Sequence, residues 1–124
     1  MGAWGNRNFD NDTAADHLSM ITGRLLKEIT EAMSGDPEEI EPDEYWGVAV
    51  PCNVELLYRL AELSYVGVML PTPEVATGWK RQYLAVWDET IDELVSSAEH
   101  RAARRAVLVE TFDRLIDAAR RETE

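Results

Sequence analysis

The densest group of polar side chains in this sequence lies near its start, at Asp10, Asn11, Asp12, Asp16 and His17. Oxygen ligands that alternate along a chain in this way can hold a hard divalent cation. The spacing departs from the calcium-loop pattern, because Ala14 and Ala15 stand where that pattern requires a ligand and a glycine. Asp and Asn also start helices for purely local reasons. We therefore predict a helix capped by Asp12, with a metal site as the alternative.

A second group of carboxylates places Asp88 over Asp92, and Glu89 over Glu93, one helical turn apart. Facing carboxylates can bind a metal or share a proton. A di-iron bundle also needs Glu-x-x-His pairs, and neither histidine has a glutamate three residues before it. We predict a solvated face instead. The basic residues expected to neutralise it come from the next helix: Arg101, Arg104 and Arg105.

Other catalytic patterns are missing from the sequence. No serine lies in a Gly-x-Ser-x-Gly turn, and neither glycine-rich phosphate pattern is present. Cys52 follows Pro51 in an apolar neighbourhood, which predicts a buried, unreactive thiol. The aromatic residues at helical spacing are expected in the core: Trp46, Trp79, Tyr83 and Trp87. The residues thus indicate no enzyme class, no catalytic residue, no metal and no cofactor.

Apolar spacing predicts the elements that must carry these residues. Residues 1–11 form a loop whose aromatic side chains pack on the body of the domain. A helix follows, ends at Gly35, and buries one face made of Leu18, Ile21, Leu25, Ile29 and Met33. Residues 36–44 contain six acidic residues and two prolines, which predicts a solvated loop.

The remaining sequence predicts three more helical regions. A short helix is expected to end or kink at Pro51, with a second segment over residues 53–65 that is apolar around much of its circumference. Apolar steps of three and four then predict helices over 74–95 and 102–119. The predicted fold is all-α, a single-domain bundle of about four helices over residues 1–124.

The net charge of the 124-residue chain is −12, from 12 basic and 24 acidic residues. An acidic envelope repels phosphate backbones, so nucleic acid is not an expected ligand. The charge is uneven, because residues 1–62 carry four basic and thirteen acidic side chains. This half would attract a basic protein partner. The acidity would also confer solubility without any partner.

The compartment is predicted from what the sequence lacks. It has one cysteine, no secretory signal and no apolar run near the ~20 residues that cross a bilayer. We expect a cytoplasmic protein that does not bind membranes. The sequence does not set its oligomeric state.

The opening Gly2-Ala3-Trp4-Gly5, followed by Phe9 to Asp16, resembles the N-terminal signature of the bacterial domain of unknown function 4259 family. Later stretches are similar to that family too: Pro73-Glu74-Val75 leading to Trp79, Tyr83 and Asp88, and Arg104 to Val107 leading to Thr111-Phe112. Members commonly have a small pair such as Thr-Gly before the Phe, where this chain has Asn6-Arg7-Asn8. The resemblance implies a small bacterial helical domain with no assigned activity, and it supplies no catalytic residues.

Two functional hypotheses follow from the residues. The first is a non-catalytic acidic helical protein that binds another protein, with an antidote or immunity protein as one example of the class. The alternative is a metal- or small-molecule-dependent enzyme with its site at the N-terminal Asp cluster. Both use one candidate surface: Trp4, Phe9, Asp10, Asn11, Asp12, Asp16 and His17.

Overall fold

The computed structural model describes residues 2–124 and confirms an all-α bundle. Its elements are α1 (Asp12–Ser34), the 3-10 helix η1 (Pro37–Ile40), α2 (Tyr45–Glu62), α3 (Pro73–Leu94) and α4 (Ala98–Thr123). Among residues 2–124 the β-structure is one isolated bridge, between Ala3 and Asn11. No helix of this range combines the length and the apolar composition needed to cross a membrane.

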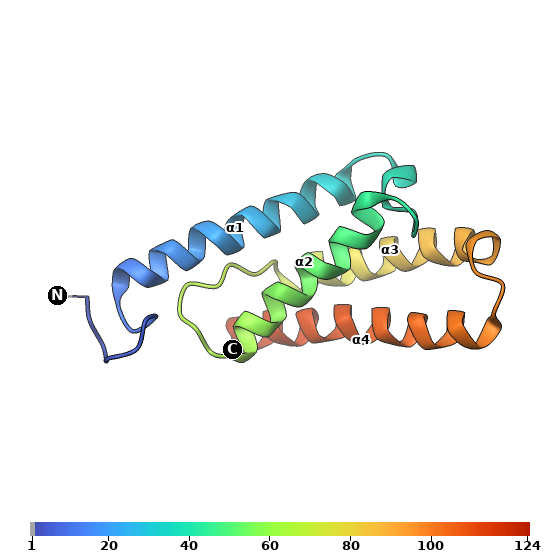
Figure 1. Cartoon of the computed structure of the whole chain (residues 1–124). Helices are drawn as coiled ribbons and strands as arrows, with labels where there is room; N and C mark the ends of the chain where they lie inside the picture. The colour runs from blue at the N-terminus through green and yellow to red at the C-terminus, as the bar shows by residue number, and fades with distance from the viewer. Residues whose placement is uncertain (1) are drawn as a thin grey trace.

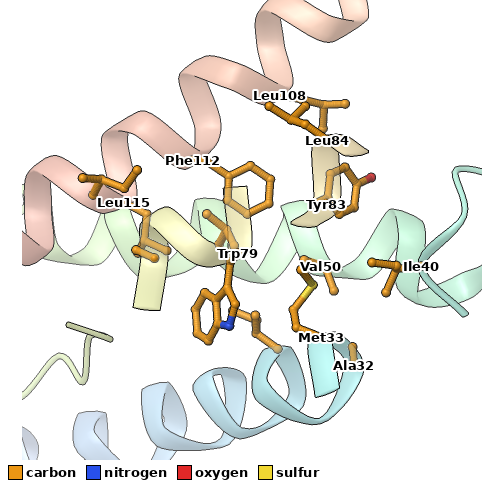
Figure 2. Packing of buried hydrophobic residues seen from close by; sticks show 14 of the residues in the cluster. Ala32, Met33, Ile40, Val50, Trp79, Tyr83, Leu84, Leu108, Phe112 and Leu115 are labelled. Atoms are coloured by element: carbon orange, nitrogen blue, oxygen red, sulfur yellow. The ribbon is translucent and has the colours of Figure 1, made fainter. Parts of the chain in front are cut away.

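The helices surround a common core. The helices α3 and α4 run antiparallel beside each other, α2 crosses α4, and α1 packs on the other side of α2 (Figure 1). Side chains from all four helices and η1 meet between them (Figure 2). The largest fully buried side chains include Tyr83, Phe112, Ile29, Ile40 and Leu57.

The helix α1 buries a face that differs by one position from the predicted one. Ile21 is exposed, and Thr22 is fully buried in its place. The Thr22 hydroxyl donates to the carbonyl of Leu18 at 2.8 Å and accepts from the amide of Met69 at 2.9 Å. Ser19 also donates to the carbonyl of Gly67 at 2.6 Å. Partly buried backbone groups of the 63–72 connection thus find hydrogen-bond partners in two short hydroxyl side chains of α1.

Of the two outcomes predicted at Pro51, an end of the helix is wrong, because α2 runs continuously from Tyr45 to Glu62 with Pro51 inside it. Proline lacks the N–H that would bond the carbonyl four residues earlier, which is that of Gly47. The hydroxyl of Tyr83, from α3, donates to that carbonyl instead. A tertiary contact thus replaces the helical hydrogen bond that the proline removes.

The acidic segment 36–44 is only partly the solvated loop that its composition predicts. It contains η1, which starts with the amide of Glu38 donating to the carboxylate of Asp36 at 3.0 Å. Ile40 enters the core with 1% of its surface exposed. The single apolar side chain of the segment anchors it, while five of its six acidic residues stay exposed and Glu41 is half-buried.

The helices α3 and α4 are joined by the ion pairs expected from the sequence. Arg105 binds Asp88 through two hydrogen bonds of 2.9 and 3.0 Å, and Arg101 lies 3.2 Å from Asp92. Arg104 is exposed and forms no ion pair with any residue that the structure describes. The predicted neutralisation of this carboxylate face is therefore confirmed for two of the three arginines.

Apolar residues at the ends of these two helices are exposed. Val75 and Leu94 of α3 and Ala102 and Ala106 of α4 face solvent. The buried face of α4 begins only at Leu108.

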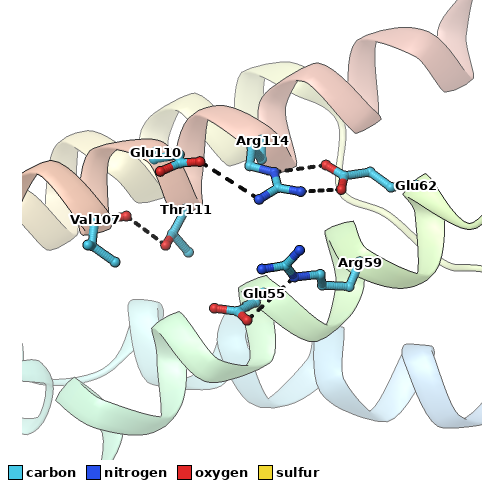
Figure 3. Close-up of polar contacts among 7 residues, drawn as sticks. All are labelled: Glu55, Arg59, Glu62, Val107, Glu110, Thr111 and Arg114. Atoms are coloured by element: carbon cyan, nitrogen blue, oxygen red, sulfur yellow. Dashed lines mark hydrogen bonds and ion pairs between the residues drawn. The ribbon is translucent and has the colours of Figure 1, made fainter.

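Arg114 connects α4 to α2. Its guanidinium forms two hydrogen bonds with the carboxylate of Glu62, one of them at 3.0 Å, and lies 4.4 Å from the ring centre of Tyr58. It also lies 3.8 Å from Glu110 on its own helix (Figure 3). The hydrogen bonds from Arg114 lower the pKa of Glu62.

Candidate functional site

The N-terminal loop folds back onto the start of α1. The amide of Trp4 donates to the carbonyl of Asp10 at 2.7 Å, and the amide of Asp12 donates to the carbonyl of Gly2 at 2.7 Å. The helix cap is Asn11, whose side chain accepts from the amide of Ala14 at 2.8 Å. The predicted cap, Asp12, is instead the first helical residue. Sequence patterns place helix ends to within a residue or two, and here the preceding Asn takes the capping role.

The carboxylates of Asp10 and Asp12 are bound within this loop. Asp12 accepts a hydrogen bond of 3.0 Å from the indole N–H of Trp4. Asp10 accepts one of 3.1 Å from the amide of Arg7. Both carboxylates lie against glycine backbone, because a Cβ at Gly2 would overlap Asp12 and a Cβ at Gly5 would overlap Asp10. These two carboxylates therefore serve to close the loop.

The other predicted residues spread outward from the loop. Phe9 stacks on Tyr65 with ring centres 4.6 Å apart, so it contacts the connection between α2 and α3. Trp4 stays half exposed, unlike the packed aromatic side chain that was expected. Asp16 and His17 are exposed on α1, and among residues 2–124 neither side chain has a hydrogen bond or an ion pair. The structure thus brings Trp4, Asp10 and Asp12 together and leaves Asp16 and His17 outside.

A second candidate surface lies on α2. Its exposed residues Tyr45, Val48, Cys52 and Leu56 form a row, which we call the α2 face. The exposed fractions are 74% for Tyr45, 55% for Val48 and 50% for Leu56. Cys52 is also exposed, so the predicted burial of its thiol is wrong. Asp43, Glu44, Ala49 and Asn53 join three of these residues around a shallow hollow at the start of the helix.

The sequence contained a signal for this surface. The four residues follow one another at steps of three, four and four, which keeps them on one side of a helix. The same spacing occurs when a helix packs into a core. The spacing could therefore have shown an apolar row, but it could not show whether the rest of the chain covers that row.

Uncompensated negative charge surrounds the start of the α2 face. Residues 28–58 contain nine acidic residues and no Lys or Arg. The carboxylate oxygens of Glu41, Asp43 and Glu44 lie within 4.8 Å of one another. Desolvation, and then repulsion from neighbouring carboxylates, of which Asp43 contributes most, raise the pKa of Glu41. Among the described residues, no acidic side chain of 36–44 forms an ion pair.

Comparison with known proteins gives one finding. The family model for the domain of unknown function DUF4259 matches residues 2–124. No curated protein and no solved structure matches the chain. The match confirms the resemblance to this family and covers the whole described range, residues 2–124.

Proposed function

Because the chain belongs to the DUF4259 family, whose function is unknown, we propose its function from the surface itself: it is a non-catalytic protein that binds another protein through the α2 face. The observation that carries this proposal is the exposure of Tyr45, Val48 and Leu56 in a single row. Contiguous apolar surface with a polar rim is typical of interaction sites. Covering such surface stabilises a complex by about 25 cal/mol per Å² of apolar area.

The charge next to the α2 face supports a basic partner. Six carboxylates of residues 36–44 lie at the start of the helix without a cation in that segment. Opposite charges speed the encounter of two proteins and disfavour partners of the wrong sign. An antidote or immunity protein that covers a basic target is one class that fits this surface.

The alternative is an enzyme with its site at the N-terminal Asp cluster. It has less support, because one carboxylate oxygen of Asp10 and one of Asp12 already accept hydrogen bonds, from the amide of Arg7 and the indole of Trp4. A metal ion at this position would have to compete with those donors. The exposed residues Asp16 and His17 offer two further ligand groups, fewer than the six or more oxygens that a calcium ion takes.

Site-specific crosslinking in the native host tests the proposal. A photoreactive phenylalanine analogue at position 45 replaces Tyr45 with a side chain of similar shape at the most exposed point of the α2 face. The matched control places the same group at Val75, an exposed apolar residue in the first turn of α3 and therefore on a different helix. We expect a discrete protein adduct from position 45 only. Equal adducts at both positions, or none at position 45, would contradict the proposal.

A further inference from the structure

We infer that the partner lays a cationic amphipathic helix along α2, with its apolar side on the α2 face and its Lys and Arg residues toward the acidic segment 36–44. This inference rests on the proposed function and names the chemistry of the partner. It follows from three features of the surface: its length, its spacing and its charge.

The α2 face has the spacing of a helix–helix contact. Tyr45, Val48, Cys52 and Leu56 follow at steps of three, four and four, which is the repeat that a second helix matches when it packs lengthwise. Leu63, the residue directly after α2, is 60% exposed and lies one further repeat along, beyond the charged Arg59 that interrupts the apolar row. At 1.5 Å per residue the row from Tyr45 to Leu63 spans about 27 Å. An amphipathic helix of similar length covers such a row with residues that recur every three or four positions.

The position of α2 in the bundle leaves this row open. One side of α2 packs against α1, where Asn53 donates to the carboxylate of Glu28 at 2.9 Å. Another side packs against α4, where Glu62 binds Arg114. The α2 face lies outside both contacts and faces solvent. A partner helix there would lie beside α1 and α4 without displacing either.

The charge selects a cationic helix over an acidic one and over a second copy of this chain. The stretch 28–58 has nine acidic residues and no basic one. A second copy would bring another net charge of −12, and the single basic residue on its α2, Arg59, already lies 3.5 Å from Glu55. A helix rich in Lys or Arg would instead supply the cations that segment 36–44 lacks.

Synthetic peptides provide the test. Three probes of 22 residues are compared. The amphipathic Lys peptide has Leu at every third and fourth position and Lys elsewhere, and the scrambled peptide has the same composition in an order without an apolar side. The Glu peptide has the first pattern with Glu in place of Lys. Binding to the full chain is measured by calorimetry at low and at high salt. We expect the amphipathic Lys peptide to bind at least tenfold more tightly than the scrambled one, and the Glu peptide not to bind.

Variants of the chain separate the apolar and the electrostatic contributions. Leu56→Glu should lower the affinity for the amphipathic Lys peptide about tenfold and leave the salt dependence of binding unchanged. The double change Glu38→Lys and Glu39→Lys, on exposed positions of η1, should weaken binding and flatten its salt dependence, because salt screens exposed charges. Val75→Glu adds a charge to α3 and should change the affinity less than twofold. Circular dichroism melts verify that each variant folds.

Four outcomes would overturn the inference. Equal binding of the scrambled peptide would show that charge alone is recognised, without a helix. An equal loss of affinity in Leu56→Glu and Val75→Glu would show that the α2 face is not the binding site. Unchanged binding by the Glu38→Lys and Glu39→Lys variant would show that the acidic segment 36–44 does not contribute to binding. A dimer in sedimentation that Leu56→Glu dissociates would assign the face to a second copy. A specific adduct at position 45 together with a failed peptide test would support protein binding through the α2 face and contradict only the proposal that the partner supplies a cationic helix.

Discussion

The hydroxyl of Tyr83 donates a hydrogen bond of 2.5 Å to the carbonyl of Gly47, the group that Pro51 leaves without a helical partner. Both residues are buried, with Tyr83 only 2% exposed. Burial raises the pKa of Tyr83 to about 12, so the hydroxyl keeps its proton over the ordinary pH range. This bond between α3 and α2 lets a proline stand inside the helix that carries the proposed binding face.

Tyr83→Phe should destabilise the fold by about 1–3 kcal/mol, because it leaves a buried carbonyl without a donor. Denaturant unfolding measures the change. The control is Tyr58→Phe, since the Tyr58 ring is buried and its hydroxyl forms none of the hydrogen bonds among residues 2–124. That control should change the free energy of unfolding by less than about 0.5 kcal/mol.

A double-mutant cycle tests whether the destabilisation by Tyr83→Phe depends on Pro51. Pro51→Ala restores a backbone N–H that can bond the Gly47 carbonyl. The cost of Tyr83→Phe should therefore be smaller in the Pro51→Ala background than in the natural chain. Equal costs in both backgrounds would show that the hydroxyl does not substitute for the missing helical bond.

Gly47→Ala should be among the most damaging single changes in α2. A Cβ at this position would overlap the carbonyl oxygen of Glu41 and stand 3.0 Å from that of Ile40, so the η1 backbone would have to move. We expect a loss of about 3 kcal/mol, near the upper end of overpacking costs. Gly23→Ala in α1 is the matched control, because nothing lies within 4 Å of the place its new Cβ would take. It should stabilise the protein by about 0.5–1 kcal/mol through helix propensity.

Glu41→Gln should raise the thermal unfolding midpoint at pH 7. The raised pKa of Glu41 means that the folded state favours its protonated form. The associated stability is present below the unfolded pKa and is lost as the pH rises through the folded pKa. Glutamine imitates the neutral carboxyl, so the variant keeps that stability at pH 7. The two proteins should converge below about pH 4, where the natural carboxyl is protonated too. A lower midpoint for the variant at pH 7 would contradict this assignment.

Glu62→Gln should show the opposite sign. Hydrogen bonds from Arg114 lower the pKa of Glu62, so its contribution to stability is present above the unfolded pKa and is lost as the pH falls through the folded value. At pH 7 the variant should be less stable by at most about 1 kcal/mol, because the pair is partly exposed. The difference should vanish in acid. A pH-independent difference would show that the loss does not come from the charge of Glu62.

Local patterns predicted the helices, and tertiary contacts decided what the patterns left open. The end of α1 at Gly35 and the helical spacing through Trp79, Leu84 and Ile91 depend on neighbours in the chain, so the sequence contained them. The continuity of α2 depends on Tyr83, which lies 36 residues from Gly47. No rule about proline and its neighbours includes that donor.

The candidate site was harder to predict for a related reason. Thr22 is polar and Ile21 apolar, yet Thr22 is the buried one, and its hydroxyl accepts a hydrogen bond from the distant amide of Met69. Cys52 and Leu56 have the spacing of buried residues, yet no described element covers them. Spacing shows which residues share a side of a helix. Burial depends on where the other helices pack.

The start of α1 provides a final test, because the structure assigns different roles to two neighbouring residues. Asn11→Ala removes the side-chain acceptor that caps the Ala14 amide and should cost about 1 kcal/mol. Asp12→Ala removes the acceptor of the Trp4 indole, which is half exposed, and should cost less than the Asn11 change. Trp4 should then become more accessible to a fluorescence quencher in the Asp12 variant alone. If Asp12→Ala costs more than Asn11→Ala, the cap belongs to Asp12 after all. If divalent cations stabilise the natural chain but not the Asp12 variant, the loop holds a metal, and the enzyme alternative regains its support.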